Sequence, residues 1–543
     1  MNPITWRLTH NSGHSEAGGA ENDKNETRRR EADLFWPLIG ALALVSTVLG
    51  LGGATPDVAW LIDMCERIAR GETAYIDIFE TTPPVPTLIY MPGVWIEQAT
   101  VLDAAAAVHI LTALTYLAVL AFTAQILPRR LTSIGRTDWH IIAPAALFLF
   151  ALSTDAFAQR ETIAAALMLP SVAVFVRRAK DGHWPAIPAR LGAAMLGGLA
   201  VAIKPPLFAA PYLALGAYYV VTTRSVRGIY SSGLAATGAI SVAITAASLL
   251  AYPDYLGDMT VLMREIYVPL FRPFGSAMIA SFIGVLLCFG AGLLIYLKET
   301  PPEASRILGL FTLAFVAIFV AQGKFFTYHA APAALFGTMT AACLIAPRVV
   351  DAVRRRFASP VDIQAGLSAL ILLIAFSHFW FGFDDRRFQM RDMSWAESLD
   401  RPTAMAVSTD ISIGFPLARR FDAQWIDRIH SQWVSLYARI MIDDPWRSPA
   451  EKTVFRAYQA RDIARTIALI KSEKPEIIIH CVAPASLWLT DRMLAEAPDL
   501  FDGYAVIAAE GPTRVLRRID IIEKAGAEET IIGPARMSVS ALP

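Results

Sequence analysis

The chain has 543 residues, of which 55% are hydrophobic and 18% are charged, and its mean hydropathy is +0.44. Because soluble globular proteins carry about 25% charged residues, this composition excludes a typical soluble enzyme and predicts a protein that crosses a membrane several times. The 48 basic residues balance the 48 acidic ones, so nothing in the overall charge favours nucleic acid as a partner. The four cysteines show no CxxC spacing and indicate neither a zinc site nor a disulfide framework.

The N-terminal segment, residues 1–33, is polar and ends in three arginines at 28–30. An apolar run at 34–53 follows it. A secretory signal would have a shorter apolar core and a cleavage site made of small residues. We therefore interpret this run as a retained first crossing, with a disordered, cytoplasmic tail before it.

Ten further apolar runs predict a mainly α fold, a polytopic membrane bundle of about 11 transmembrane helices spanning residues 34–382. Arginine and lysine clusters fall between alternate runs, and all of them face the cytoplasm if the N-terminus is inside and there are eleven crossings. Everything after about residue 382 then faces outward. The runs lie near 103–127, 139–154, 161–176, 190–204, 206–223, 228–251, 277–297, 306–323, 330–347 and 361–381.

The segment 84–98 is apolar enough to resemble another crossing, but it is rich in proline. Counting it as a crossing would place the arginine clusters outside. We therefore expect it to lie in the outer interface of the membrane.

The first outer loop, 54–102, contains a predicted helix that begins near Asp57 and ends at Gly71. Asp57 lies in the first turn of this helix, where water meets the membrane. It either caps the helix or serves as an active-site carboxylate. Further along the loop, three polar side chains either form an ordered turn or contact substrate: Tyr75, Asp77 and Glu80.

The second outer loop, 153–162, holds Asp155, Arg160 and Glu161 between two short apolar helices. Ionisable residues at membrane depth are costly and usually functional, although an ion pair that stabilises the helix ends is the alternative. We expect Asp57 and Asp155 to converge on one cleft.

Positive side chains also lie on the predicted outer face, against the usual charge bias of membrane proteins. Lys204 ends one crossing, and the turn Q-G-K-F-F-T-Y-H at 322–329 supplies Lys324, Tyr328 and His329. This exception indicates an anionic ligand such as a phosphate. Lysines that reach toward lipid head groups, and a structural histidine, are the alternatives.

The order of these features resembles the GT-C superfamily of polytopic glycosyltransferases, which includes the protein mannosyltransferases and the aminoarabinose transferases of lipid A. The resemblance covers about residues 34–380. It is carried by the acidic residue after the first helix (Asp57), the Pro-Pro segment with its interfacial helix, and the second acidic residue in a very short outer loop (Asp155). The run D-V-A-W-L…G-E-T-A-Y-I-D-I-F-E-T-T-P-P is especially similar to uncharacterised bacterial members.

The resemblance implies a sugar donor on a polyprenyl phosphate, transfer at the outer leaflet of the bacterial inner membrane, and inversion at the anomeric carbon. It assigns catalysis to Asp57. Many relatives carry Glu where Val58 follows, and Lys where Thr82 precedes Pro83. The phosphate contact usually assigned to that lysine therefore passes to other cations: Arg160, Lys204 or Lys324, with His329 beside them.

The chemistry implied for these residues is consistent with their types. A carboxylate such as Asp57 can accept the proton of the attacking acceptor hydroxyl, and fixed cations can stabilise the phosphate that leaves. A divalent metal, Mg²⁺ or Mn²⁺, stays open as a cofactor, since no clear ligand spacing occurs. The expected partners are the polyprenyl-phosphate-linked sugar, membrane lipids, and an acceptor that is a glycan, a lipid or a protein.

Residues 383–543 have the composition of a soluble domain, predicted to be periplasmic and α/β. The predicted strands are 404–409, 476–481, 504–509 and 513–518, and the predicted helices are 460–472 and 487–497. His480 and Cys481 are interpreted as core residues. Two other functions remain as alternatives: a transporter or flippase of a lipid-linked glycan, and a polysaccharide ligase of the O-antigen type.

Overall fold

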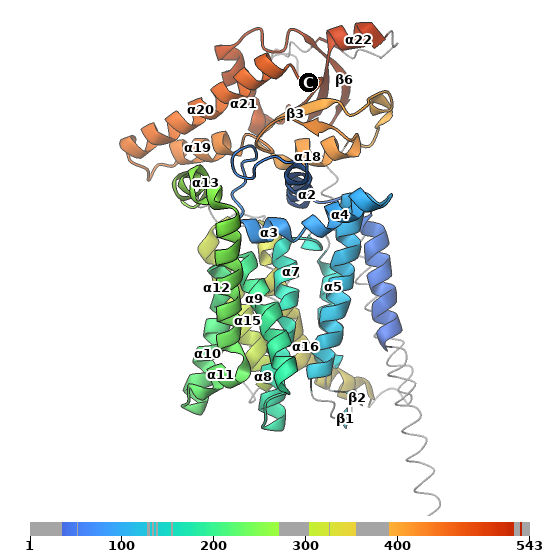
Figure 1. The fold of residues 1–543 in the computed structure, drawn as a ribbon, viewed down its shortest axis with the longest axis vertical. Helices are drawn as coiled ribbons and strands as arrows, with labels where there is room; N and C mark the ends of the chain where they lie inside the picture. The colour runs from blue at the N-terminus through green and yellow to red at the C-terminus, as the bar shows by residue number, and fades with distance from the viewer. Residues whose placement is uncertain are drawn as a thin grey trace, which may run out of the picture.

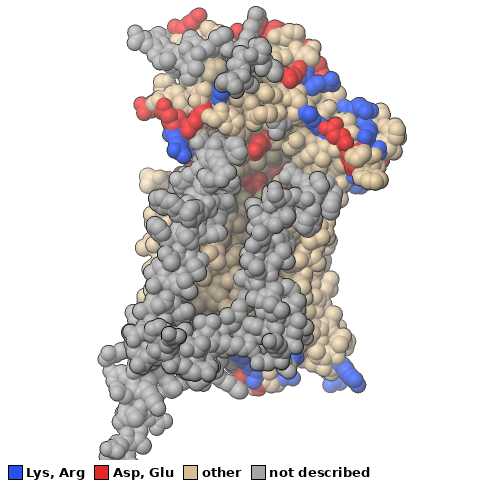
Figure 2. Space-filling view, turned by 180° about the vertical axis from the view of Figure 1, so that it is seen from behind, with Lys and Arg blue, Asp and Glu red and all other residues tan. Residues whose placement is uncertain are grey.

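The structure is a computed structural model that describes residues 35–51, 53–127, 131–132, 135–136, 139–153, 156–270, 303–324, 326–354, 390–525 and 533–534. An elongated helical bundle forms one part of the molecule, and an α/β domain covers one end of it (Figure 1). Charged side chains gather on the α/β domain and at the opposite end of the bundle, with a largely uncharged flank between them (Figure 2). This distribution is the one expected of a protein that spans a membrane.

A helix occupies every predicted crossing segment that falls within the described residues. The segments near 277–297 and 361–381 lie outside them. Within the part of the chain that the structure describes, four helices are long and apolar enough to span a membrane by themselves: α5, the continuous pair α7 and α8, α12 and α15. The bundle consists of the helix Phe35–Gly50, α5 (Ala104–Ile126), α6 (Trp139–Leu147), the π-helix η1 (Phe148–Leu152), α7 (Arg160–Leu167), α8 (Leu169–Asp181), α9 (Ile187–Ile203), α10 (Ala210–Thr223), α11 (Arg227–Ser232), α12 (Leu234–Ala251), α15 (Glu303–Gln322) and α16 (Ala331–Arg354).

Three short helices, α2 (Pro56–Ala69), α3 (Pro84–Leu88) and α4 (Met91–Ala99), lie between the bundle and the α/β domain (Figure 1). Helix α2 begins and ends where the sequence predicts, because Gly71 adopts a φ of +100° that few other residues tolerate. The proline-rich segment lies across the end of the bundle, as expected. It forms two helices instead of one, and Pro92 occupies the first turn of the second, where its missing N–H costs nothing.

The α/β domain contains a six-stranded sheet in the order β4-β3-β5-β7-β6-β8. Strands β4, β3 and β5 are parallel, and the other pairs are antiparallel. All four predicted strands are present within two residues of their predicted ends, whereas α18 and α19 were not predicted. The elements are β3 (Thr403–Val407), α18 (Ile411–Arg420), β4 (Gln424–Trp425), α19 (Trp433–Asp443), α20 (Pro449–Glu473), β5 (Ile477–Cys481), α21 (Pro484–Glu496), β6 (Tyr504–Glu510), β7 (Thr513–Arg518), α22 (Ile519–Ala525) and β8 (Gly533–Pro534).

Helix α18 docks the α/β domain onto α2. The ring of Trp60 on α2 meets that of Phe415 on α18 edge to face, with their centroids 5.1 Å apart. Arg419 forms an ion pair of 2.8 Å with Glu66, and Arg67 Nη1 donates to the backbone oxygen of Asp427 at 2.9 Å. These contacts hold the α/β domain directly above the residues that the sequence singled out.

Candidate active site

A cavity of about 590 Å³ lies between the end of the bundle and the α/β domain. It has two walls of different origin. The bundle and its loops supply the first, which we call the bundle wall: Thr55, Asp57, Trp60, Glu80, Thr81, Gln159, Arg160, Tyr267 and Tyr328 are among its residues. The α/β domain supplies the second, which we call the domain wall: it includes Thr409, Asp410, His430, Ser431, Trp433, Tyr437, Cys481 and Ser486.

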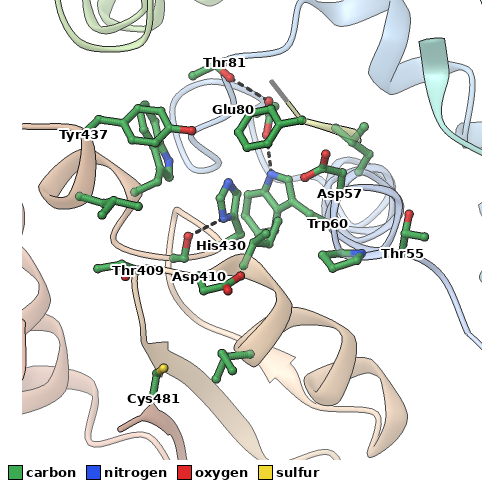
Figure 3. A pocket seen from close by; sticks show the side chains of 18 of the residues that line it. Thr55, Asp57, Trp60, Glu80, Thr81, Thr409, Asp410, His430, Tyr437 and Cys481 are labelled. Carbon is green, nitrogen blue, oxygen red and sulfur yellow. Dashed lines mark hydrogen bonds between the residues drawn. The ribbon is translucent and has the colours of Figure 1, made fainter. Parts of the chain in front are cut away.

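Asp57 projects into this cavity from the first turn of α2 (Figure 3). The N-cap residue of α2 is Thr55, which makes no side-chain capping hydrogen bond, and Asp57 is the acidic residue of the first turn. Burial raises the pKa of Asp57 above its usual 3.8, while Arg160 and a hydrogen bond with Tyr328 oppose that rise. Asp57 is half-buried, and a carboxylate that faces a cleft with a shifted pKa is suited to accept a proton.

Trp60 and Glu80 lie beside Asp57 on the same wall. The indole Nε1 of Trp60 donates to Glu80 Oε2 at 2.6 Å (Figure 3). The other carboxylate oxygen accepts from the backbone N–H of Thr82 at 2.6 Å. Glu80 therefore holds the Pro-Pro loop against α2.

Arg160 supplies the positive charge of the bundle wall. Its Nη1 donates to the Thr82 hydroxyl at 2.6 Å, and its Nε lies 3.3 Å from Glu161 Oε1. The side chain is 13% exposed and lines the cavity, so a guanidinium faces the same space as the Asp57 carboxylate. Thr82, the residue that precedes Pro83, thus contacts the arginine.

Behind Arg160, a buried ion cluster is centred on Glu161, whose side chain is 1% exposed. Lys204 Nζ donates to Glu161 Oε1 at 2.7 Å, and His329 Nε2 lies 3.7 Å from the same oxygen. Helices α7 and α9 and the turn before α16 therefore bring together three residues from distant parts of the sequence. Glu161, Lys204 and His329 are not among the cavity-lining residues.

The remaining predicted site residues lie elsewhere. Lys324 Nζ donates to the backbone oxygens of Tyr267 and Leu270, the second at 2.5 Å. Asp77 is exposed and accepts from the Thr73 N–H at 2.8 Å, which closes a turn. The Tyr75 hydroxyl donates to the backbone oxygen of Thr82 at 3.0 Å. Asp155 lies outside the described residues, so its expected convergence with Asp57 stays a prediction.

Tyr328 lines the cavity and connects the two groups of residues. Its hydroxyl hydrogen-bonds Asp57, and its ring meets that of His329 edge to face, with their centroids 4.6 Å apart. The turn at 322–329 therefore contributes to the site mainly through Tyr328, whereas Lys324 supports the neighbouring backbone.

The domain wall was missed by the sequence reasoning. His430 lies across the cavity from Asp57, with its Nδ1 2.8 Å from Ser431 Oγ and its ring 5.4 Å from that of Trp60 (Figure 3). Burial lowers the pKa of His430, which keeps the imidazole neutral. Nothing in the local sequence around His430 resembles a motif. The parallel order of β3 and β5 was the one available signal, because loops at the carboxyl ends of such strands commonly bind ligands.

The predicted core pair, His480 and Cys481, divides between two roles. His480 is buried and its Nε2 lies 2.8 Å from the Thr490 hydroxyl, as a core histidine should. Cys481 is also buried, but it borders the cavity. Among the described residues, no group of three or more His, Cys, Asp or Glu side chains is arranged to hold a metal ion.

The architecture is similar to that of solved structures. No protein-family model and no curated protein matches the chain. Two crystal structures of ArnT from Cupriavidus metallidurans do match. The one bound to undecaprenyl phosphate has a TM-score of 0.52 and 16% identity and covers 88% of this chain and 97% of ArnT. The apo form has a TM-score of 0.52 and 15% identity and covers 90% and 98%. The chain therefore has the fold of ArnT, an aminoarabinose transferase of the GT-C family, as its sequence motifs predicted.

Proposed function

We propose that this protein is a membrane glycosyltransferase that takes a sugar from a polyprenyl phosphate and transfers it to an acceptor hydroxyl. One observation carries the proposal: a half-buried carboxylate, Asp57, and a guanidinium, Arg160, face one cavity at the end of an ArnT-like bundle. The crystal structure of ArnT bound to undecaprenyl phosphate supports a donor of this class.

In this proposal Asp57 is the general base. The acceptor hydroxyl gives its proton to Asp57 while its oxygen bonds to the anomeric carbon, and the bond from that carbon to the phosphate oxygen breaks on the opposite face. The configuration at the anomeric carbon is thereby inverted. The raised pKa of Asp57 brings its basicity closer to neutral pH, where a general base is most effective.

Arg160 binds the donor phosphate and stabilises the charge that it gains when the sugar leaves. Glu161 and Thr82 hold the guanidinium from two sides, so its position is set before the donor arrives. Lys204 and His329 contact Glu161 and so act on Arg160 only indirectly. Lys324 positions the loop that carries Tyr267. Arg160 is thus the main phosphate contact among the predicted cations.

The proposed orientation follows from the charge bias of the sequence. The arginine clusters face the cytoplasm of a bacterial inner membrane, and the cavity and residues 383–543 face the periplasm. Transfer on that side requires a donor whose sugar is already exposed there, which a polyprenyl phosphate provides.

The deciding experiment measures transfer by the purified protein in lipid nanodiscs with undecaprenyl-phosphate-linked sugars. Asp57→Asn preserves size and one oxygen but cannot act as the general base, so turnover should fall by about 10²–10⁴-fold with no loss of thermal stability. Asp254→Asn, at an exposed position, is the control. Near-normal transfer by Asp57→Asn would remove Asp57 from catalysis and end the proposal in this form.

A further inference from the structure

The domain wall is built like a ligand site in its own right. Strands β3 and β5 are parallel neighbours, and the loops that follow them meet at the cavity. Thr409 follows β3 and Ser486 follows β5, and their hydroxyl oxygens lie 2.9 Å apart. Carboxyl ends of adjacent parallel strands are a recurrent place for ligands, because the loops there leave a crevice.

Apart from Asp410, the polar side chains named on the domain wall are uncharged donors and acceptors, and they lie next to aromatic rings. Tyr437 lies on one side of His430, and its hydroxyl points toward the cavity (Figure 3). Trp433 packs edge to face against Tyr437, with their centroids 5.6 Å apart. Aromatic surface combined with hydroxyl and imidazole groups suits a ligand with both C–H faces and hydroxyls.

Charge separates the two walls. Among the described residues that line the cavity, the only lysine or arginine is Arg160, on the bundle wall. Asp410 adds negative charge to the domain wall and accepts from the Ser412 N–H at 2.9 Å. The N-terminus of α21 also borders the cavity, but the amides of Ser486 and Leu487 already donate to the Ala483 oxygen. A phosphate or carboxylate would find no cation here.

We propose that the domain wall is the acceptor subsite and that it binds a neutral, hydroxyl-rich carbohydrate, with His430 and Tyr437 hydrogen-bonding its hydroxyl groups. This inference rests on the proposed function, since it divides the cavity between a donor phosphate at Arg160 and an acceptor sugar opposite. His430 is well placed for this role, because its Nδ1 is oriented by Ser431 and the ring lies across the cavity from Asp57.

The test measures glycan binding by the full-length protein in nanodiscs on an array. The array carries neutral oligosaccharides, the same oligosaccharides bearing phosphate or carboxylate groups, and serine-containing peptides. Wild-type protein should retain neutral oligosaccharides. His430→Phe and Tyr437→Phe each remove the hydrogen-bonding group while keeping an aromatic ring, so each should weaken that binding by about three- to tenfold. Trp446→Phe changes a 92% exposed aromatic residue outside the cavity and is the matched control.

Binding of undecaprenyl phosphate by the same preparations separates this inference from the proposed function. The two variants should bind undecaprenyl phosphate as the wild type does, because Arg160 is unchanged. Retention of anionic glycans or peptides alone, retention of no probe, or wild-type glycan affinity in both variants would each overturn the acceptor subsite. Failure to bind undecaprenyl phosphate, with glycan binding intact, would instead overturn the donor assignment.

Discussion

The two walls of the cavity differ in how they are made. On the bundle wall, Asp57 and Arg160 carry charge, and behind the wall the buried Glu161 carboxylate contacts both Arg160 and Lys204. On the domain wall, hydroxyl and aromatic groups dominate, and His430 is neutral. The difference indicates a division of labour. In the proposed mechanism, the charged groups hold a phosphate and take a proton, and the hydroxyl and aromatic groups bind the second substrate.

The largest effect is expected at the centre of the buried ion cluster. Glu161→Ala leaves the charges of Arg160 and Lys204 without their carboxylate, so the free energy of unfolding should fall by about 3–5 kcal/mol. Thermal unfolding in detergent measures this loss. On the α/β domain, Asp499→Ala removes the exposed ion pair with Lys471 and should cost less than about 1 kcal/mol. Equal losses in the two variants would show that burial does not distinguish the two regions.

The next effect concerns the interface where the two regions meet. Burial raises the pKa of Asp63 on α2 from 3.8 to about 6. The folded state therefore holds this proton more tightly than the unfolded chain, and stability falls as pH rises from about 4 to 6. Asp63→Asn should remove this loss and raise stability at pH 8 by about 2–3 kcal/mol. Unfolding followed from pH 4 to 8 checks it.

The exposed Asp443→Asn is the control for that pH series and should leave the profile unchanged. Glu66, whose pKa is raised to about 7, should leave a residual pH dependence between about 4.5 and 7 in the Asp63→Asn protein. A variant whose profile matches the wild type would mean that the α2–α18 interface is not the pH-sensitive part of the fold.

A smaller effect is expected for donor affinity. Arg160→Gln removes a charged contact to the phosphate, which is worth about 1.5–3 kcal/mol, so the Kd for undecaprenyl phosphate should rise roughly 10- to 150-fold. Lys204→Met and Lys324→Met should have less effect, because Glu161 and backbone oxygens already occupy these ammonium groups. Binding titrations in nanodiscs rank the three. A larger loss for either lysine than for Arg160 would reverse the assignment of the phosphate contact.

Much of the bundle wall could be predicted from the sequence, for a physical reason. Burying a charge near a membrane is costly, so Asp57, Arg160, Glu161 and Lys204 stand out against apolar surroundings wherever they occur. The contrast between apolar runs and charged loops also predicted the helical segments of the bundle. The pattern of short apolar segments predicted the strands of the α/β domain. The sequence could not show that Lys324 and Lys204 have different partners, because both follow apolar runs. The partner of each lysine depends on which loop packs beside it.

What the sequence by itself determined is a membrane bundle, an α/β domain that follows it and the charged half of a candidate site. The tertiary structure alone decided that α18 docks on α2, and that His430, Tyr437 and Ser486 therefore close a cavity over Asp57. Hydroxyl and aromatic residues are ordinary in a soluble domain, where exposing or burying them costs little. Their significance arises only from position, and long-range packing between segments more than 300 residues apart sets that position.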